Sequence, residues 1–397
     1  MINASLYGVI KESMQHPEIG RVYGMINGVE GFIAGKTVCL SELLSNNELE
    51  VMKATPAAFL GSCRYKLPAD LSAEIYPQLF EKFRELDIGW IFYIGGNDSM
   101  DTVAKLSAYA EKVGNGIKLI GIPKTIDNDL VLTDHTPGYG SAAKFVATAV
   151  RDICMDSQVY NTSSVTIVES MGRNAGWLTA SSVLARLYPG ANPALIYLPE
   201  VSFSVDGFFK DIQEEIEKRG NVVVCVSEGV RDENNVLLCE YAQQIAVDTF
   251  GHKNLTGCGK QLENMVRAKF GVKTRSVELN VTQRCLASLV SETDLGEAVA
   301  AGVHGVNAAL QGKSGQMIAC RRAEQDVYQL GYECVDVNLV CNQEKAFPLE
   351  WITGRGNDIG EAFIDYALPL IAGELPRLMR DGLPAYCCLD TKTMRLR

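Results

Sequence analysis

A glycine-rich turn at 95–99, Gly-Gly-Asn-Asp-Ser, is the first place in this sequence where residue types and spacing suggest chemistry. Gly95 and Gly96 allow the backbone to approach an oxyanion closely. A helix that follows would present free N–H groups and its positive dipole end to that anion. The turn therefore predicts a phosphate cradle, although a Gly-Gly turn can equally serve only to reverse the chain.

A second turn, Pro-Lys-Thr-Ile-Asp-Asn-Asp at 123–129, follows an apolar run at 117–122. It places two carboxylates, Asp127 and Asp129, at the end of a predicted strand beside the glycine turn. One carboxylate can accept a proton from an attacking hydroxyl, and the other can hold a divalent cation or orient the first. The simpler alternative is an acidic loop that caps the next helix.

Two further turns, Met-Gly-Arg-Asn-Ala-Gly-Trp at 171–177 and Ser-Glu-Gly at 227–229, also follow apolar runs, and a later segment at 275–284 contains two arginines. Arg173, Arg275 and Arg284 are suited to fork onto a phosphate, and Glu228 to accept hydrogen bonds from sugar hydroxyls. A single arginine of this kind is more often part of a surface ion pair. Four such strand ends together are harder to attribute to packing, and they predict phosphoryl transfer.

Short apolar runs separated by segments with helical spacing indicate the elements that must position these turns. The runs lie at 90–94, 117–122, 164–168, 194–198 and 222–226. This alternation predicts an α/β fold with a mostly parallel sheet covered by helices on both faces, whose ligands bind at the carboxyl ends of the strands. A chain of 397 residues is more typical of two lobes than of one.

Several classes of protein are excluded by the sequence. The net charge of −11 comes without a basic stripe, which argues against nucleic acid as a partner. No run approaches the roughly 20 apolar residues of a membrane helix, and the 12 cysteines are dispersed without a C-x-x-C pair. We therefore expect a soluble cytoplasmic protein with reduced thiols. The P-loop pattern is absent, and G-x-G-x-x-G is absent from the first turns.

These motifs, in this order and approximate spacing, resemble the phosphofructokinases. The resemblance extends from Ile2-Asn3-Ala4 to Pro-Leu-Ile-Ala-Gly-Glu at 369–374. It implies two lobes, each a mostly parallel sheet flanked by helices. We expect a donor-binding lobe at 1–160 plus about 285–335, a sugar-phosphate lobe at 161–284, and a C-terminal helical tail at 336–397.

The resemblance also implies a role for each residue of the motifs. Asp127 is expected to be the general base on the 1-hydroxyl of fructose 6-phosphate, with Thr125 and Asp129 beside it, and Arg64 to contact the phosphoryl donor. The donor-binding set is Gly95, Gly96, Asn97, Asp98, Ser99 and Lys124. The fructose 6-phosphate set is Thr125, Asp127, Met171, Gly172, Arg173, Glu228, Arg275 and Arg284, with Arg275 reaching across from a neighbouring subunit. The cofactor is Mg²⁺, held by Asn97, Asp127 and Asp129.

Two positions predict pyrophosphate as the donor. Asp98 and Lys124 replace glycines of the ATP-using members. The Asp98 side chain would fill the space of an α-phosphate and repel it, while the Lys124 ammonium points at the terminal phosphates. An Asp98–Lys124 salt bridge without influence on the donor is the alternative. The resemblance implies a reversible enzyme of glycolysis or gluconeogenesis, which forms a homodimer or homotetramer. Two alternatives remain: an ATP-dependent phosphofructokinase and a non-catalytic subunit that binds sugar phosphate.

The chain departs from the family pattern in three ways. It begins Met1-Ile2-Asn3-Ala4, where relatives have a strand and a Gly-Gly-Pro-Thr turn before Val-Ile-Asn-Ala. We therefore expect the N-terminal lobe to lack its first strand, and hypothesise a valine codon (GUG) taken as the start of a longer protein. Asn97 stands where many members have a metal-binding aspartate, and its neutral amide is a weaker ligand. Ser164 and Val281 replace an arginine and a histidine, and neither is assigned a role.

Overall fold

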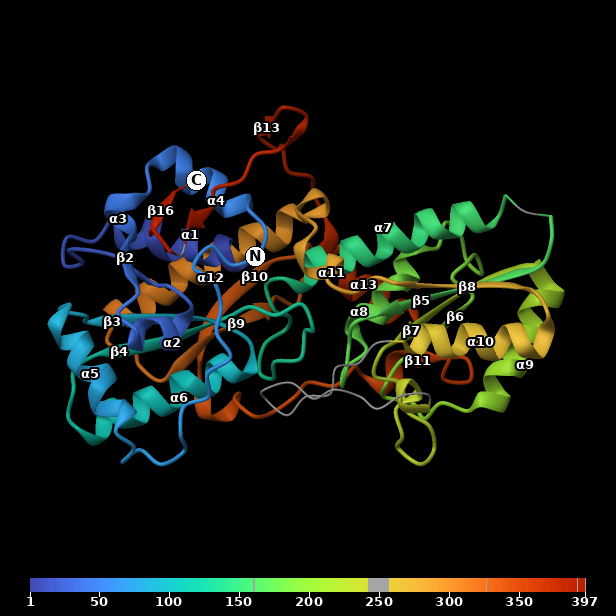
Figure 1. Cartoon of the computed structure of the whole chain (residues 1–397), viewed down its shortest axis with the longest axis horizontal. Coiled ribbons are helices and arrows are strands. Elements are labelled where there is room, and N and C mark those ends of the chain that lie inside the picture. The colour runs from blue at the N-terminus through green and yellow to red at the C-terminus, as the bar shows by residue number, and fades with distance from the viewer. Residues whose placement is uncertain (160, 242–256, 326, 391, 397) are drawn as a thin grey trace.

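The computed structural model describes residues 1–159, 161–241, 257–325, 327–390 and 392–396. Two four-stranded sheets lie side by side along the long axis of the molecule, each with helices on both faces (Figure 1). All five apolar runs that predicted strands are strands in the structure, and the α/β fold class is confirmed. None of the helices in the described part of the chain is both long and apolar enough to span a membrane.

The first sheet has the order β10-β9-β4-β3, with β3, β4 and β9 parallel and β10 antiparallel at one edge. Its strands are β3 (Trp90–Gly95), β4 (Lys118–Pro123), β9 (Gln316–Arg322) and β10 (Leu330–Asp336). Alternate residues of β4 face opposite layers: Leu119 packs in the core with α6 (Asn97–Lys112), whereas Ile120 and Ile122 pack against α12 (Glu292–Leu310). This alternation fixes the register, because a shift of one residue would turn both faces around.

The second sheet is entirely parallel, with the order β6-β7-β5-β8. Its strands are β5 (Ser164–Ser170), β6 (Leu195–Tyr197), β7 (Asn221–Ser227) and β8 (Lys273–Glu278). One face packs against α9 (Val205–Arg219) and α10 (Cys258–Phe270), and the other against α7 (Tyr139–Ser157) and α8 (Trp177–Ala180). Burial on both faces explains why β5 and β7 are nearly continuous apolar runs.

The remaining helices and strands among the described residues up to 310 surround these sheets. The helices are α1 (Ile2–Ser13), α2 (Gly28–Ile33), α3 (Leu40–Leu43), α4 (Asn46–Ala54), α5 (Ile75–Glu85) and α11 (Thr282–Cys285). Three 3₁₀ turns lie at η1 (Ser181–Ala185), η2 (Leu238–Tyr241) and η3 (Ala287–Leu289), and β1 (Tyr23–Met25) pairs with β2 (Thr37–Cys39). Since α7 shares its core with β5 and β7, we propose to count this helix with the sugar-phosphate lobe, and otherwise keep the division expected from the sequence.

An open edge runs along β3. Lys118 N donates to Gly89 O and Lys124 N donates to Gly95 O, so the backbone of alternate residues points toward β4. The N–H and C=O groups of Trp90, Phe92 and Ile94 therefore point the other way, toward a cavity of about 780 Å³ between β3, α1 and the segment 18–25. We expected one strand fewer in this lobe, and β3 is the edge strand of its four-stranded sheet.

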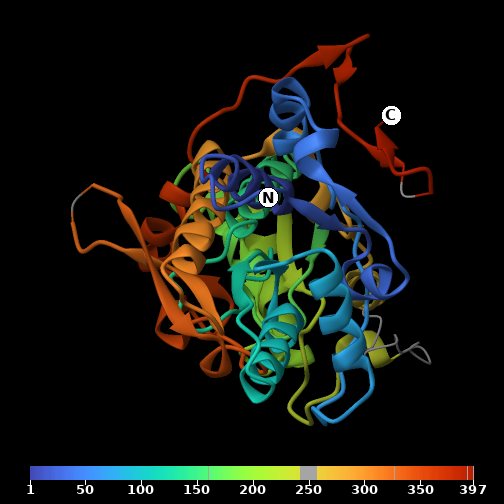
Figure 2. The same ribbon diagram turned by 90° about the vertical axis from the view of Figure 1, so that its left-hand side faces the viewer.

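The prediction of a helical tail over 336–397 is wrong for most of its length. Within the described residues, its regular elements are η4 (Val337–Leu339), η5 (Leu349–Trp351), β11 (Ile352–Thr353), β12 (Asp358–Ile359), α13 (Glu361–Ala367), η6 (Pro369–Ile371), β13 (Met379–Arg380), β14 (Leu383–Pro384), β15 (Leu389–Asp390) and β16 (Arg395–Leu396). The β13–β14 hairpin projects from the body (Figure 2), whereas Cys387, Leu389 and Leu396 pack back against the N-terminal lobe. Asp381 and Gly382, with φ of 51° and 81°, form the Asp-Gly turn of the β13–β14 hairpin, and Pro376 and Pro384 prevent a continuous helix.

Candidate active site

The glycine turn lies where β3 ends and α6 begins. Lys124 N donates to Gly95 O at 2.9 Å, which joins this turn to the second motif. A Cβ on Gly95 would lie 2.0 Å from Ser99 Oγ, so only glycine allows the turn and the helix to approach this closely. A Cβ on Gly96 would lie 3.7 Å from the Thr125 Cβ. The first turn of α6, with its positive dipole end, therefore faces the Lys124–Thr125 backbone.

The Thr125–Asp127 pair is held by two hydrogen bonds. Thr125 Oγ1 donates to Asp127 Oδ2 at 3.2 Å and accepts from Asp127 N at 3.1 Å. Between the two acids lies Asn128, which is fully buried with a left-handed φ of 57°. Asn128 Oδ1 accepts from Thr136 N at 3.0 Å, so the turn is tied to the returning end of its own loop. The side chain of Asp127 is thereby fixed in one orientation.

The electrostatics of this turn favour a bound cation or a substrate. Burial raises the pKa of Asp127, while the Thr125 hydrogen bond and the charges of Lys124, Arg173 and Arg284 oppose the rise. Burial and the nearby Asp127 charge both raise the pKa of Asp129. Two partly buried carboxylates that repel each other are costly without compensation. Such perturbed groups are typical of functional sites.

Lys124 lies with the acids rather than with Asp98. Burial lowers the pKa of Lys124, and the charges of Asp127 and Asp129 oppose this, whereas Arg284 adds to it. The Asp98 side chain is exposed at the first turn of α6, and the ion pairs between described residues include no Asp98–Lys124 bridge. The alternative of a salt bridge between these two residues is therefore wrong.

The second lobe contributes its own glycine turn. Gly172 has a φ of 139°, and Ser227 Oγ donates to Gly172 O at 2.6 Å. Burial raises the pKa of Glu228 to about 7, with opposing effects from its hydrogen bond to the Gly172 backbone and from Arg173, and with a further rise from Asp127. The electrostatic influence of Arg173 on both Asp127 and Glu228 indicates that the two lobes face each other across one site.

The structure separates some predicted residues from this site. Asn97 uses its amide on the main chain of the 342–343 segment, where its oxygen accepts from Asn342 N at 2.6 Å and its Nδ2 donates to Gln343 O. These contacts engage the Asn97 amide with the protein itself, and its role as a metal ligand stays a prediction. Arg275 lies on edge strand β8 and pairs with Asp156 at 3.5 Å on the surface, so within one chain it does not join the acid cluster.

The structure also shows the surroundings of three other predicted site residues. Arg64 is exposed on the loop 61–68, which packs over Asn27 through the Asn27 Nδ2 to Ser62 O hydrogen bond of 3.1 Å. Met171 N donates to Gln283 Oε1 at 3.2 Å, and Arg284 follows on α11. The roles of Arg64, Met171 and Arg284 toward a substrate stay predictions.

A segment at 342–347 was missed from the sequence, although it contacts three of the predicted turns, at 95–99, 123–129 and 171–177. Lys345 N donates to Asp129 O at 2.7 Å, and Lys345 O accepts from the indole of Trp177 at 3.0 Å. Glu344 accepts from Asn174 at 2.8 Å. This strap joins the acid turn to the second lobe. No local pattern signals it, because its partners are more than a hundred residues away in the chain.

A glycine turn at a helix N-terminus, a partly buried acid pair and cations from two lobes are typical of phosphoryl-transfer enzymes. The phosphofructokinase family model matches residues 1–309. A pyrophosphate--fructose 6-phosphate 1-phosphotransferase of Halomonas elongata is 36% identical over 97% of this chain and 92% of its own length. The crystal structure of a pyrophosphate-dependent phosphofructokinase from Marinobacter aquaeolei superposes with a TM-score of 0.86 at 36% identity, over 97% of this chain and 92% of that one. A sulfofructose kinase of Alkalicoccus urumqiensis is 34% identical over 87% of this chain and 88% of its own length.

This chain belongs to the phosphofructokinase family.

Proposed function

We propose that this protein transfers a phosphoryl group reversibly from pyrophosphate to the 1-hydroxyl of fructose 6-phosphate, giving fructose 1,6-bisphosphate and phosphate. The observation that carries the proposal is the Thr125–Asp127 pair, surrounded by the charges of Lys124, Arg173 and Arg284. We further propose that the enzyme works in the cytoplasm in glycolysis or gluconeogenesis, as a homodimer or homotetramer whose interface brings Arg275 to a neighbouring site.

In the proposed mechanism, Asp127 accepts the proton of the 1-hydroxyl as this oxygen attacks the terminal phosphorus. The hydrogen bond from Thr125 keeps one carboxylate oxygen of Asp127 engaged, which leaves the other for the substrate hydroxyl. The first turn of α6 and Lys124 hold the donor phosphates, and Arg173 and Arg284 stabilise charge from the sugar side. We assign Glu228, whose pKa burial raises to about 7, to a hydrogen bond with a sugar hydroxyl.

Asp127 and Asp129 also fit a divalent cation. Their mutual repulsion is what such an ion relieves, and Mg²⁺ is commonly bound by one or two carboxylates together with substrate phosphates. No group of three or more acidic, histidine or cysteine side chains that could hold a metal lies among the described residues, which suits a metal that arrives with the donor. We propose Mg²⁺, which would neutralise charge on the transferring phosphoryl group.

Asp129→Asn is expected to raise the Mg²⁺ concentration needed for half-maximal activity by about 10-fold or more, because a charged oxygen ligand is lost. Mg²⁺ titration of initial rates at saturating substrates measures the shift. Asp152→Asn, an exposed substitution on α7, is the matched control and should leave the titration unchanged. An unchanged Mg²⁺ requirement in Asp129→Asn would remove this residue from the metal site.

The donor assay tests the proposed function directly. Purified protein with fructose 6-phosphate and Mg²⁺ is expected to turn over with pyrophosphate, and to be at least about 100-fold less active with ATP, because Asp98 and Lys124 narrow the donor site and place charges against an α-phosphate. Phosphate release and fructose 1,6-bisphosphate formation are both measured. Strong activity with ATP alone would overturn the donor, and no activity with either would favour a non-catalytic subunit.

A second acceptor is favoured by two observations. By the family resemblance, Ser164 and Val281 replace an arginine and a sugar-binding histidine, and a relative that is 34% identical is named sulfofructose kinase. The same assay with sulfofructose as the acceptor distinguishes the two. A larger kcat/KM for sulfofructose would replace fructose 6-phosphate in the proposal while leaving the donor and the catalytic residues in place.

A further inference from the structure

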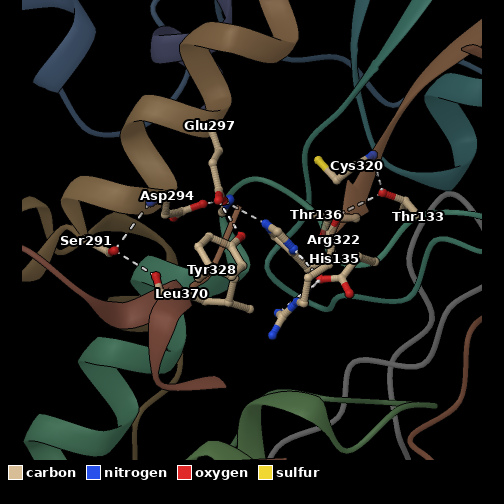
Figure 3. A network of polar contacts seen from close by, with 12 residues as sticks. Thr133, His135, Thr136, Ser291, Asp294, Glu297, Cys320, Arg322, Tyr328 and Leu370 are labelled. Atoms are coloured by element: carbon tan, nitrogen blue, oxygen red, sulfur yellow. Dashed lines mark hydrogen bonds and ion pairs between the residues drawn. The ribbon is translucent and has the colours of Figure 1, made fainter. Parts of the chain in front are cut away.

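The loop 124–138, which carries Asp127 and Asp129, is held at its far end by a buried network of charged groups (Figure 3). At its centre lies His135, which is 1% exposed. His135 Nδ1 lies 2.8 Å from Asp134 Oδ1, and His135 Nε2 lies 2.7 Å from Glu297 Oε2 on α12. Both ring nitrogens therefore face carboxylate oxygens, which only accept hydrogen bonds when ionised. The ring satisfies both as a donor only in its doubly protonated form.

Each carboxylate has a second donor, so the network is closed. Asp134 Oδ1 also accepts from Arg322 at 3.1 Å, and Glu297 Oε1 accepts from the hydroxyl of Tyr328. The guanidinium of Arg322 stacks over the Tyr328 ring, 4.9 Å from its centroid. Two cations therefore face two carboxylates, and replacing His135 would leave buried charge uncompensated.

The network reaches the catalytic turn through short, direct links. Thr136, the next residue after His135, donates from Oγ1 to Thr125 O at 3.0 Å and from N to Asn128 Oδ1 at 3.0 Å. One turn before Glu297 on the same helix, Asp294 accepts from Gly138 N at 2.7 Å. Helix α12 thus holds the returning end of the loop at two points, and that end holds the turn between Thr125 and Asn128.

We propose that His135 is a positioning residue, whose ring bridges Asp134 and Glu297 and so keeps the 124–138 loop in the conformation that presents Asp127 and Asp129. His135 is not one of the residues that we assign to substrate binding. It acts through the backbone of Thr125 and the side chain of Asn128. This inference rests on the proposed function, and it adds a residue that the sequence motifs left without a role.

Because His135 carries a charge, its positioning role predicts a characteristic pH dependence of kcat. Although burial lowers it, the hydrogen bonds with Asp134 and Glu297 raise the pKa of His135 to about 9. The ring faces Asp134 on its own loop and Glu297 on α12. The other charged and titratable groups of the elements around it are Asp294 on α12, Cys320 and Arg322 on β9, Tyr328 after β9, Tyr366 on α13, and Lys345. Loss of its proton above pH 9 removes one of the two hydrogen bonds, and the loop is released.

His135→Gln is expected to lower kcat by about 10- to 100-fold, with little change in KM for fructose 6-phosphate, because the reacting groups and not the sugar contacts are displaced. The wild-type fall in kcat above about pH 9 should be absent from this variant. Glu297→Gln, which leaves the ring with Asp134 alone, should move that fall at least about 1 pH unit lower. His304→Gln, an exposed substitution on the same helix, is the control and should retain the wild-type profile.

The protonation state of the His135 ring can be measured independently of activity. ¹⁵N-histidine NMR of the wild-type protein should show both nitrogens of one buried ring protonated at pH 8, with this signal absent from His135→Gln. A neutral ring at pH 8 would overturn the proposal, and so would an alkaline fall in kcat that Glu297→Gln does not move. If His135→Gln does not fold, the pH profile of Glu297→Gln and the NMR titration of the wild type still test the proposal. Absence of turnover in the wild type would contradict the proposed function alone, because the NMR result would stand.

Discussion

Asp127→Asn is expected to reduce kcat by about 100- to 10,000-fold, which is the contribution of a well-placed general base. The amide has nearly the shape of the carboxylate and can keep the contact with Thr125, but it cannot take the proton of the 1-hydroxyl. Steady-state kinetics with pyrophosphate measure the loss, and calorimetric titration with fructose 6-phosphate measures binding. Binding is expected to change little, since removing a negative charge does not weaken the site toward a phosphate.

The control for this variant is Asp152→Asn, which removes a carboxylate from the exposed side of α7. Its kcat should equal that of the wild type. The pH dependence provides a second check. Burial raises the pKa of Asp127, so the wild-type kcat/KM should fall as the pH drops through that raised value, and this acidic limb should vanish in Asp127→Asn. A variant with unchanged turnover would remove Asp127 from the mechanism.

Lys124→Gly is expected to lower kcat/KM for pyrophosphate by about 10- to 150-fold, the effect of losing one hydrogen bond between charged groups. The structure separates the two positions that the sequence treated as a pair. Lys124 lies with the acids, so its loss should be large, whereas the exposed Asp98 should contribute less to pyrophosphate use and act mainly against ATP. The double variant with both glycines should lose pyrophosphate activity, although ATP activity need not appear.

Lys118→Gly, at the opposite end of the same strand β4, is the matched control for this variant. Lys124→Gly should also shift the acidic limb of the pH profile upward, because the Lys124 charge lowers the pKa of Asp127. Unchanged pyrophosphate kinetics together with an unshifted limb would show that the ammonium does not face the donor.

The proposed active site brings together several acidic and basic side chains whose charges the protein alone does not fully compensate. Burial raises the pKa of Asp127, Asp129 and Glu228 and lowers that of Lys124. By contrast, the His135 network pairs every carboxylate with a hydrogen-bond donor. This difference is physically reasonable, because the first set is arranged for charged ligands and the second only has to hold a loop.

The stability effect of His135 follows from the same pKa. Since its folded value of about 9 lies above the unfolded 6.5, its contribution to the free energy of unfolding is fully present below pH 6.5 and is lost as the pH rises through 9. Urea unfolding of the wild type and His135→Gln should therefore differ most at acidic to neutral pH. This measurement accompanies the kinetic test and shows how far the loss of kcat exceeds any loss of folded protein.

The sequence by itself determined the five buried strands, the α/β class and the turns that carry Gly95, Asp127, Gly172 and Glu228. Apolar runs followed by glycine and acidic residues are local signals, and parallel strands place their carboxyl ends at one edge of a sheet. The Asp-Gly turn at 381–382 was also a local signal, which the expectation of a helical tail overlooked. The family resemblance supplied roles for the residues, but not their orientations.

Only the tertiary structure decided which partner each polar side chain meets. It turned the amide of Asn97 toward the 342–343 backbone, placed Lys124 with Asp127, and joined His135 to Glu297, which is 162 residues away in the chain. Such contacts depend on how α12 and the 342–347 strap cross the loop. Hydrophobic periodicity specifies which face of an element is buried, whereas long-range polar pairing depends on distances that form only after the layers have packed.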